Sequence, residues 1–236
     1  MNVVNVASWM ELRIGQCPDG NSTFFETDAF PWVREVEANW SVIRKELDVL
    51  LEHKEEIPNL QDVSPEQSLV AHGESWKSFF LYGFGHKIEQ NCAKCPQTAR
   101  IVARIPGLKM AMFSILAPNS KIPPHRGPYR GLLRYHLGLI IPSPASSCGI
   151  RVANETRSWQ EGRSLIFDDS YDHEAWNDSD SHRVVLFVDF VRPLPFPLSL
   201  MNRAMIWQIS KLPFVTNAVR RLRAQKPFSG AGHNSG

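Results

Sequence analysis

The chain has 236 residues, of which 43% are hydrophobic and 21% charged, and its formal net charge is +2. These values are ordinary for a soluble globular protein, and a chain of this length can bury a core without disulfide bonds. Its four scattered cysteines exclude a disulfide framework and favour a reduced, cytoplasmic setting. The N-terminus lacks the pattern of a signal peptide, and no stretch approaches the roughly 18 apolar residues of a membrane span.

Residues 1–75 are predicted to form an N-terminal helical segment. One helix is expected over residues 31–53, because apolar side chains recur there at three- and four-residue spacing. These side chains are Val33, Val36, Trp40, Ile43, Leu47 and Leu50. Residues 54–75 are mostly polar and contain two prolines, so we expect a surface loop.

Residues 76–196 have the pattern of a β-rich domain. The segment 76–82 is aromatic and expected to be extended, and a short helix is expected after Pro96. Further strands are predicted at 108–117, 132–141, 148–153, 163–168, 173–177 and 183–191. Many short strands separated by turn residues favour an antiparallel sandwich or barrel. The run 184–190 is apolar on both faces except for Asp189, which predicts a central strand.

Residues 197–236 form a basic tail whose apolar residues again recur at helical spacing. No Asp or Glu occurs from Phe190 to the end, whereas seven of the 26 basic residues lie there. The segment from Phe190 onward therefore has a formal charge of +7 and the rest of the chain −5. An amphipathic basic helix fits peripheral contact with an anionic membrane, here through residues 198–226. Packing of these helices on the barrel or on a second subunit is the alternative. The last eight residues are expected to be disordered.

Two histidines occupy similar positions along the chain. His125 lies in a proline-rich turn between predicted strands, and His173 lies in a strand-turn-strand segment. Arg183 follows ten residues after His173. Fe(II) in oxygenases is bound by imidazole and carboxylate groups and keeps open positions for a 2-oxoacid and O₂. A guanidinium on a neighbouring strand suits the far carboxylate of that cosubstrate. The pattern is compatible with an iron oxygenase, although histidines in strand-rich chains are commonly structural.

Three blocks of sequence resemble the aspartyl/asparaginyl β-hydroxylase family. They are HRGPYRGLLRYHLGLIIP, CGIRVANETRSWQEGRSLIFDDSYDHEAWND and HRVVLFVDFVRPLP. The resemblance implies a mainly β fold with a double-stranded β-helix (jelly-roll, cupin-like) core and with N-terminal and C-terminal helices. It also implies an Fe(II)- and 2-oxoglutarate-dependent dioxygenase, which uses O₂ to hydroxylate an unactivated C–H bond.

The same resemblance implies roles for individual residues. The iron-binding histidines of the family correspond to His125 and His173, which with Arg183 are the expected catalytic residues. The side chains implied to hold 2-oxoglutarate are Ser114, Arg134, His136 and Arg183. Arg183, aided by the serine, is expected at the 5-carboxylate, and the Arg-x-His pair at the 1-carboxylate.

Gly127 stands where most 2-oxoglutarate enzymes have the carboxylate of a His-x-Asp/Glu motif. The resembled family shares this absence, which implies water in place of a third protein ligand. Asp168 and Asp169, upstream of His173, either support a metal-bound histidine or cap their own turn.

The substrate class stays open between a lipid and an amino acid, either free or in a peptide, and a non-catalytic role is a further alternative. The blocks look closest to the bacterial branch of the family, which includes hydroxylases of C2 of lipid acyl chains. The alternatives are an Asp or Asn side chain in a peptide, a free amino acid, or a non-catalytic metal-binding jelly-roll module. Nucleic acid is not expected, because the basic residues lack interleaved aromatics. Cys92 and Cys95 receive no predicted role.

Overall fold

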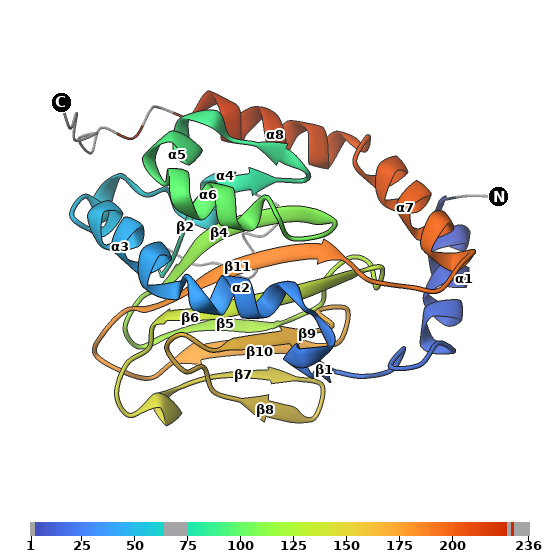
Figure 1. The fold of residues 1–236 in the computed structure, drawn as a ribbon, viewed down its shortest axis with the longest axis horizontal. Coiled ribbons are helices and arrows are strands. Elements are labelled where there is room, and N and C mark those ends of the chain that lie inside the picture. The colour runs from blue at the N-terminus through green and yellow to red at the C-terminus, as the bar shows by residue number, and fades with distance from the viewer. Residues whose placement is uncertain (1–2, 64–74, 226–227, 229–236) are drawn as a thin grey trace.

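The core of the protein consists of two antiparallel β-sheets that face each other (Figure 1). The computed structural model describes residues 3–63, 75–225 and 228. The seven-stranded sheet has the order β1-β9-β6-β11-β4-β2-β3, and the four-stranded sheet has the order β5-β10-β7-β8. The strands are β1 (Phe24–Phe25), β2 (Trp76–Gly83), β3 (His86–Lys87), β4 (Leu108–Leu116), β5 (Ser120–His125), β6 (Leu132–Ile140), β7 (Cys148–Val152), β8 (Glu155–Arg157), β9 (Ser164–Phe167), β10 (His173–Asn177) and β11 (Arg183–Val191).

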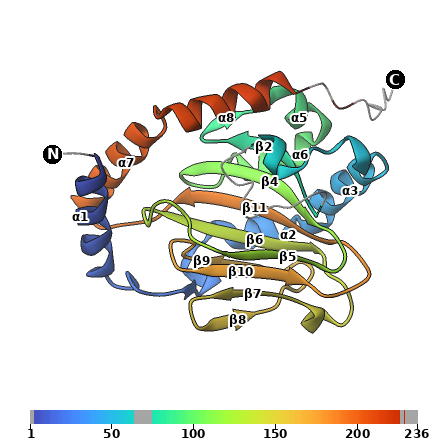
Figure 2. The same cartoon turned by 180° about the vertical axis from the view of Figure 1, so that it is seen from behind.

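Side chains on the larger sheet alternate between a helix-covered outer side and an inner side that faces the smaller sheet. On β11, Leu186 and Val188 belong to the outer core, whereas Val185 and Phe187 belong to the inner one. Helices α2 and α3 cover the outer side (Figure 1), and the four-stranded sheet lies on the other side (Figure 2). The predicted mainly β jelly-roll with helices at both ends is confirmed.

The helices are α1 (Val3–Gly15), α2 (Trp32–Ala38), α3 (Trp40–Leu51), α4 (Leu60–Val63), α5 (Glu89–Lys94), α6 (Pro96–Val102), α7 (Leu198–Ile209) and α8 (Pro213–Ala224). Short 3₁₀ helices occur at Thr27–Ala29, Lys54–Glu56 and Ala145–Ser147. Among the described helices, none has the length and hydropathy needed to cross a membrane.

The prediction of one helix over residues 31–53 is wrong, because α2 and α3 are separated at Asn39. This residue leaves the helical region, with φ −101° and ψ 10°. Its side-chain amide donates to the carbonyl of Glu35 at 2.8 Å, a local bond by which asparagine competes with helix continuation. The predicted loop 54–75 is also partly wrong, since two short helices lie within it; its residues 64–74 fall outside the described part of the chain.

Strand β5 corrects the prediction that His125 lies in a turn. Pro123 and Pro124 argued against a strand, because proline cannot donate a ladder hydrogen bond. However, β5 is an edge strand of the smaller sheet, where one side needs no donors. The predicted central strand is confirmed, because β11 lies between β6 and β4.

The tail forms the two helices expected from its periodicity. Met205 and Ile206 of α7 are buried against α1, and Val215 and Leu222 of α8 are also buried. Both helices therefore pack on the body of the protein through their inner faces. The predicted disorder of residues 229–236 lies outside the described residues.

Candidate active site

His125 and His173 lie directly opposite each other on β5 and β10. Their ring centroids are 4.1 Å apart. Each ring places its Nδ1 at a backbone carbonyl two residues upstream: that of Pro123 at 2.9 Å for His125 and that of Tyr171 at 3.0 Å for His173. A carbonyl can only accept, so Nδ1 carries the proton and Nε2 keeps its lone pair. This tautomer is the one a metal ligand requires.

The environment keeps both imidazoles neutral. Burial lowers the pKa of His173 to about 3, with Arg134 and His125 adding to the shift. Burial also lowers the pKa of His125, which is half-buried. Nε2 of His173 is buried and has no hydrogen-bond partner among the described residues. Two adjacent neutral imidazoles on one cavity, one of them with an unsatisfied Nε2, fit a divalent metal ion.

Arg183 is a buried cation with no counter-charge among the described residues. It is only 1% exposed, and its Nε and Nη1 find no acceptor within the described parts of the chain. The guanidinium lies over the ring of Trp159, with 4.6 Å between its Cζ and the ring centroid. Burial lowers the pKa of Arg183 to about 10, so the group stays charged at neutral pH. An unpaired buried guanidinium is costly, and it makes a strong binding site for an incoming carboxylate.

Ser114 and His136 lie on the same inner surface as Arg183. The hydroxyl of Ser114 accepts a hydrogen bond from Trp76 at 2.9 Å, which leaves its own proton free to donate. His136 is 6% exposed, and neither of its ring nitrogens has a partner in the described structure. The structure thus gathers His125, His173, Arg183, Ser114 and His136 around one small cavity.

Arg134 is held differently from the sequence expectation. Its Nε donates to Asp189 at 2.8 Å, and its Nη2 lies 2.8 Å from a carboxylate oxygen of Asp169. These two carboxylates hold the pKa of Arg134 above its usual value, although burial alone would lower it. The guanidinium is therefore already paired, and its role toward the 1-carboxylate of a cosubstrate stays a prediction.

Asp189 is a site residue that the sequence analysis noted only as a polar exception in an apolar strand. It lies opposite Arg134 in the pairing of β11 with β6 and is 7% exposed. A carboxylate in a central strand needs a cationic partner, because an unpaired buried charge is very unfavourable. The need of Asp189 for a cationic partner was therefore the feature of the sequence that could have predicted its pairing with Arg134.

Asp169 occupies the space that a side chain at position 127 would need. A Cβ built on Gly127 would lie 2.2 Å from Oδ2 of Asp169. The backbone N–H of Gly127 also donates to the carbonyl of Asp169 at 2.7 Å. Burial raises the pKa of Asp169, against the opposing effect of Arg134. Position 127 has no carboxylate of its own, and the carboxylate of Asp169, from the loop before β10, lies in the space beside it.

We expect Gly127→Ala to destabilise the protein by about 1–3 kcal/mol, because the new methyl group must displace the Asp169 carboxylate from Arg134. In an Asp169→Ala background the same change should cost less, since the clashing oxygens are gone. Denaturant unfolding of the two single variants and the double variant gives the coupling free energy. Strictly additive effects would contradict the steric account.

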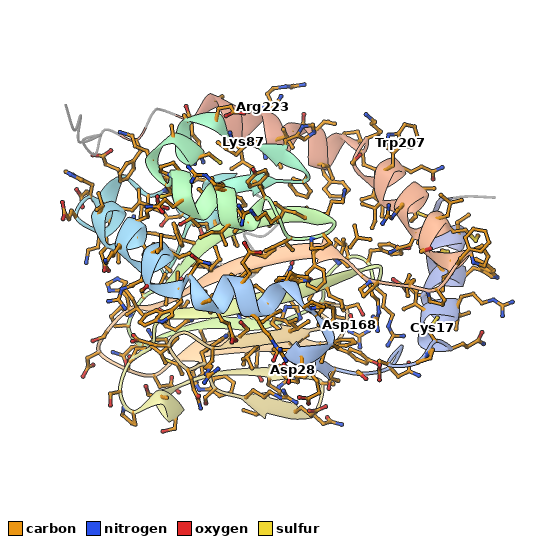
Figure 3. All side chains as sticks on the ribbon, viewed as in Figure 1. Cys17, Asp28, Lys87, Asp168, Trp207 and Arg223 are labelled. Atoms are coloured by element: carbon orange, nitrogen blue, oxygen red, sulfur yellow. The ribbon has the colours of Figure 1, made fainter. Side chains whose placement is uncertain are left out.

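Asp168, labelled in Figure 3, has a structural role. It is fully buried and accepts hydrogen bonds from Arg192 at 2.7 Å and from the backbone N–H of Ser170 at 3.0 Å. Arg130 donates to it as well, at 3.3 Å. The two aspartates, which the sequence left undecided, therefore differ: Asp168 anchors the loop before β10, and Asp169 faces the site.

A cleft of about 400 Å³ opens next to the histidine pair. Its walls are mainly apolar and include Leu60, Trp76, Phe80, Phe84, Met110, Met112, Leu132, Phe187, Phe214, Ala218 and Leu222. Its polar lining includes His125, Arg134, Asp169 and Asp189, together with Lys109 and Arg126. The cleft and the inner cavity around Arg183 share Trp76, His125, Arg134 and Phe187, so the two spaces adjoin.

Cys92 and Cys95 are buried free thiols outside this site. Burial raises the pKa of Cys92 to about 11 and raises that of Cys95 further, so both stay protonated. Among the described residues, neither belongs to a cluster able to hold a metal ion. Their environment is that of packed thiols rather than of a reactive pair.

Comparison with known proteins agrees with this geometry. Residues 37–193 match the model of the aspartyl/asparaginyl beta-hydroxylase family. The ornithine lipid ester-linked acyl 2-hydroxylase of Rhizobium tropici is 46% identical over 213 residues, which are 90% of this chain and 76% of that protein. Human aspartyl/asparaginyl beta-hydroxylase is 35% identical over 173 residues, which are 71% of this chain but only 22% of the human protein.

Among solved structures, the cupin domain of Schizosaccharomyces pombe Cnp3 aligns with 56% of this chain and 72% of its own chain, at 9% identity and a TM-score of 0.37. Both sequence relatives described above are hydroxylases by name, which supports a hydroxylase. The family model covers most of the chain and includes both histidines and Arg183. This chain therefore belongs to the aspartyl/asparaginyl β-hydroxylase family.

Proposed function

We propose that this protein is an Fe(II)- and 2-oxoglutarate-dependent dioxygenase that hydroxylates C2 of a lipid acyl chain. The observation that carries the proposal is the apolar cleft of about 400 Å³ that adjoins both the histidine pair and the unpaired Arg183. The identity to an ester-linked acyl 2-hydroxylase over 90% of the chain supports the choice of substrate class.

His125 and His173 are the proposed iron ligands, each through Nε2. Their Nδ1 bonds to backbone carbonyls fix the rings, so the side chains lose little conformational entropy when a metal binds. Bound iron would supply the activation of O₂ and the oxidation of the C–H bond. With only two protein ligands, more coordination positions stay open for cosubstrate and O₂ than in a site with a third carboxylate.

Arg183 is the proposed partner of the 5-carboxylate of 2-oxoglutarate, and the free hydroxyl proton of Ser114 is the proposed second donor. The inner cavity measures about 20 Å³. A five-carbon diacid therefore requires side chains at the boundary with the cleft to change rotamer. Pairing of the buried Arg183 charge offsets that cost. His136 and Arg134 are proposed to contact the other end of the cosubstrate.

Asp169 is proposed as a positioning residue. Its carboxylate lies where the side chain of a His-x-Asp/Glu motif would begin, and Arg134 fixes its orientation. In this place it would accept a hydrogen bond from a water molecule on a bound metal ion and orient that water, without being a direct ligand.

The cleft is proposed to bind the acyl chain along its apolar walls. Burial of each methylene contributes about 0.8 kcal/mol and excludes water from the reacting carbon. C2 lies next to the ester carbonyl, so the polar end of the lipid must lie close to His125. Lys109 and Arg126 line the same cleft and suit an acidic group on that polar end.

The location proposed for the protein is cytoplasmic. Its four free thiols fit a reducing compartment.

The test is a substrate comparison with the iron-loaded protein. An ester-acylated aminolipid dispersed in detergent and a peptide containing Asp and Asn are each incubated with 2-oxoglutarate and O₂. We expect the lipid to gain one oxygen atom by mass spectrometry, at C2 of an acyl chain, with an equal amount of succinate formed. Omission of 2-oxoglutarate is the control. Oxygen gained by the peptide alone would favour the alternative Asp/Asn hydroxylase, and no succinate with either would reject the dioxygenase.

A further inference from the structure

The exposed large apolar side chains of the described residues are concentrated on one part of the molecule. Except for Val49 on α3, all of them lie on α1 or between Phe196 and Phe214. They are Trp9, Leu12, Phe196, Leu200, Met201, Trp207 and Phe214. Helices α1 and α7 pack side by side, and α8 continues from α7 along the same edge of the molecule (Figure 1). Exposed apolar patches of this kind mark interaction surfaces.

Helix α7 has apolar residues on two opposite faces. Met205 and Ile206 pack inward against α1. Leu200 and Trp207, seven positions apart and thus on one side of the helix, are each 63% exposed. A helix that only packs on its own protein would need one apolar face. The outward face therefore requires a second partner.

Basic side chains lie over two of these exposed rings, although α1 also carries the partly exposed Glu11. Arg13 lies over the ring of Trp9 at 5.3 Å, and Lys211 lies over the ring of Trp207 at 5.6 Å. Arg203 is exposed on α7. No Asp or Glu occurs in the chain from Phe190 onward. Figure 3 places Trp207 and Arg223 along the same upper edge. Exposed tryptophans next to cations fit the interface of an anionic bilayer, where rings enter the headgroup region and cations meet lipid phosphates.

Helix α8 lines the proposed substrate cleft, and α7 contacts a residue that lines it. Phe214, Ala218 and Leu222 of α8 line it, and Phe214 is also 40% exposed. On α7, the inward Asn202 accepts a hydrogen bond from Tyr129, a cleft residue, at 2.9 Å. The cleft is thus bounded by the segment that carries the exposed apolar side chains.

We propose that α1, α7 and the start of α8 form a docking face for an anionic lipid bilayer, made of Trp9, Leu12, Leu200, Met201, Trp207 and Phe214 with Arg13, Arg203 and Lys211. Docking there brings the cleft to the membrane surface, so an acyl chain enters without crossing water. The inference rests on the proposed function for its purpose, but the docking face itself is tested without catalysis.

The experiment is vesicle flotation of the metal-free full-length protein without 2-oxoglutarate. The vesicles contain phosphatidylcholine alone or with about 30% phosphatidylglycerol, an anionic lipid. We expect flotation with the anionic vesicles, weakened by salt. The Leu200→Glu/Trp207→Glu variant should bind at least tenfold more weakly, because two apolar contacts are lost. The matched control is Val49→Glu, which changes an exposed apolar residue on α3 and should bind as the wild type does.

Three results would overturn the docking face. The first is no flotation of the wild type with anionic vesicles, and the second is equal loss of binding in the Val49→Glu control. The third is a dimer in sedimentation equilibrium that Leu200→Glu/Trp207→Glu dissociates, because a second copy would then cover the face. Failure of the proposed function appears separately, as no oxidation of a detergent-dispersed lipid by a protein that still floats.

Discussion

Arg183→Met is expected to make the ligand-free protein more stable while weakening its binding of 2-oxoglutarate by about 10². The stability gain follows from removing a buried charge that has no acidic partner in the described structure. Burial lowers the pKa of Arg183 to about 10, so the guanidinium is still charged at neutral pH. Its burial during folding is therefore unfavourable. Replacement of a buried ion pair by apolar side chains of similar volume is often neutral or stabilising by about 1–4 kcal/mol, and a buried charge with no partner has no attraction to lose.

The loss of binding has the opposite cause. Removal of one partner from a buried pair of guanidinium and carboxylate costs about 2–5 kcal/mol, which corresponds to about 30-fold to several thousandfold in affinity. Thermal unfolding with and without 2-oxoglutarate, in the presence of Mn(II), measures both effects, because a bound ligand raises the melting temperature.

The matched control is Arg34→Met, which removes an arginine from a surface ion pair with Asp28. Exposed pairs contribute little, so neither stability nor ligand response should change much. A destabilised Arg183→Met protein that still responds to 2-oxoglutarate would mean that Arg183 is a structural residue and not the anion site.

His173→Ala and His125→Ala are each expected to abolish iron binding and succinate formation. With Gly127 between β5 and the following loop, the two imidazoles are the proposed protein ligands, and loss of either leaves one. Neither change should unfold the protein, since both rings are neutral and each bonds a backbone carbonyl only two residues away. Iron content after anaerobic loading and removal of free metal, with turnover measured as succinate, gives the readout.

His182→Ala is the control for these variants. His182 precedes Arg183 but lines a different cavity, on the side of Lys54 and Lys77. It should retain iron and turnover. Full iron content in His173→Ala would contradict the proposed ligand set, and loss of iron in all three variants would point to a general loss of structure.

Much of the fold could be predicted from local pattern. Short apolar runs separated by turn residues predicted most of the strands, and β11 was recognised as central because both of its faces are apolar. Strand β5 was missed, because its two prolines are acceptable only at an edge, and sequence alone does not show which strand is at the edge. The break between α2 and α3 was missed because Asn39 fits the helical spacing while its side chain ends the helix.

The candidate site also has features that the sequence predicts and features that it does not. The two histidines and Arg183 stood in recognisable blocks, and the structure brings them together. The pairing of Arg134 with Asp169 and Asp189 depends on strand register and loop path, which no spacing encodes. The Asp169 carboxylate occupies the space that a side chain at Gly127 would need, and this proximity likewise depends on the folded path of the loop, which the sequence pattern does not show.

The central claim is a two-histidine metal site without a carboxylate ligand, and a crystal structure with Mn(II) and 2-oxoglutarate tests it most directly. Anomalous scattering locates the metal. The account predicts one metal ion bound to Nε2 of His125 and of His173, with Asp169 reaching it only through water and Arg183 on the far carboxylate of 2-oxoglutarate. A metal ion bound directly by the Asp169 carboxylate, or one located away from the two histidines, would contradict it.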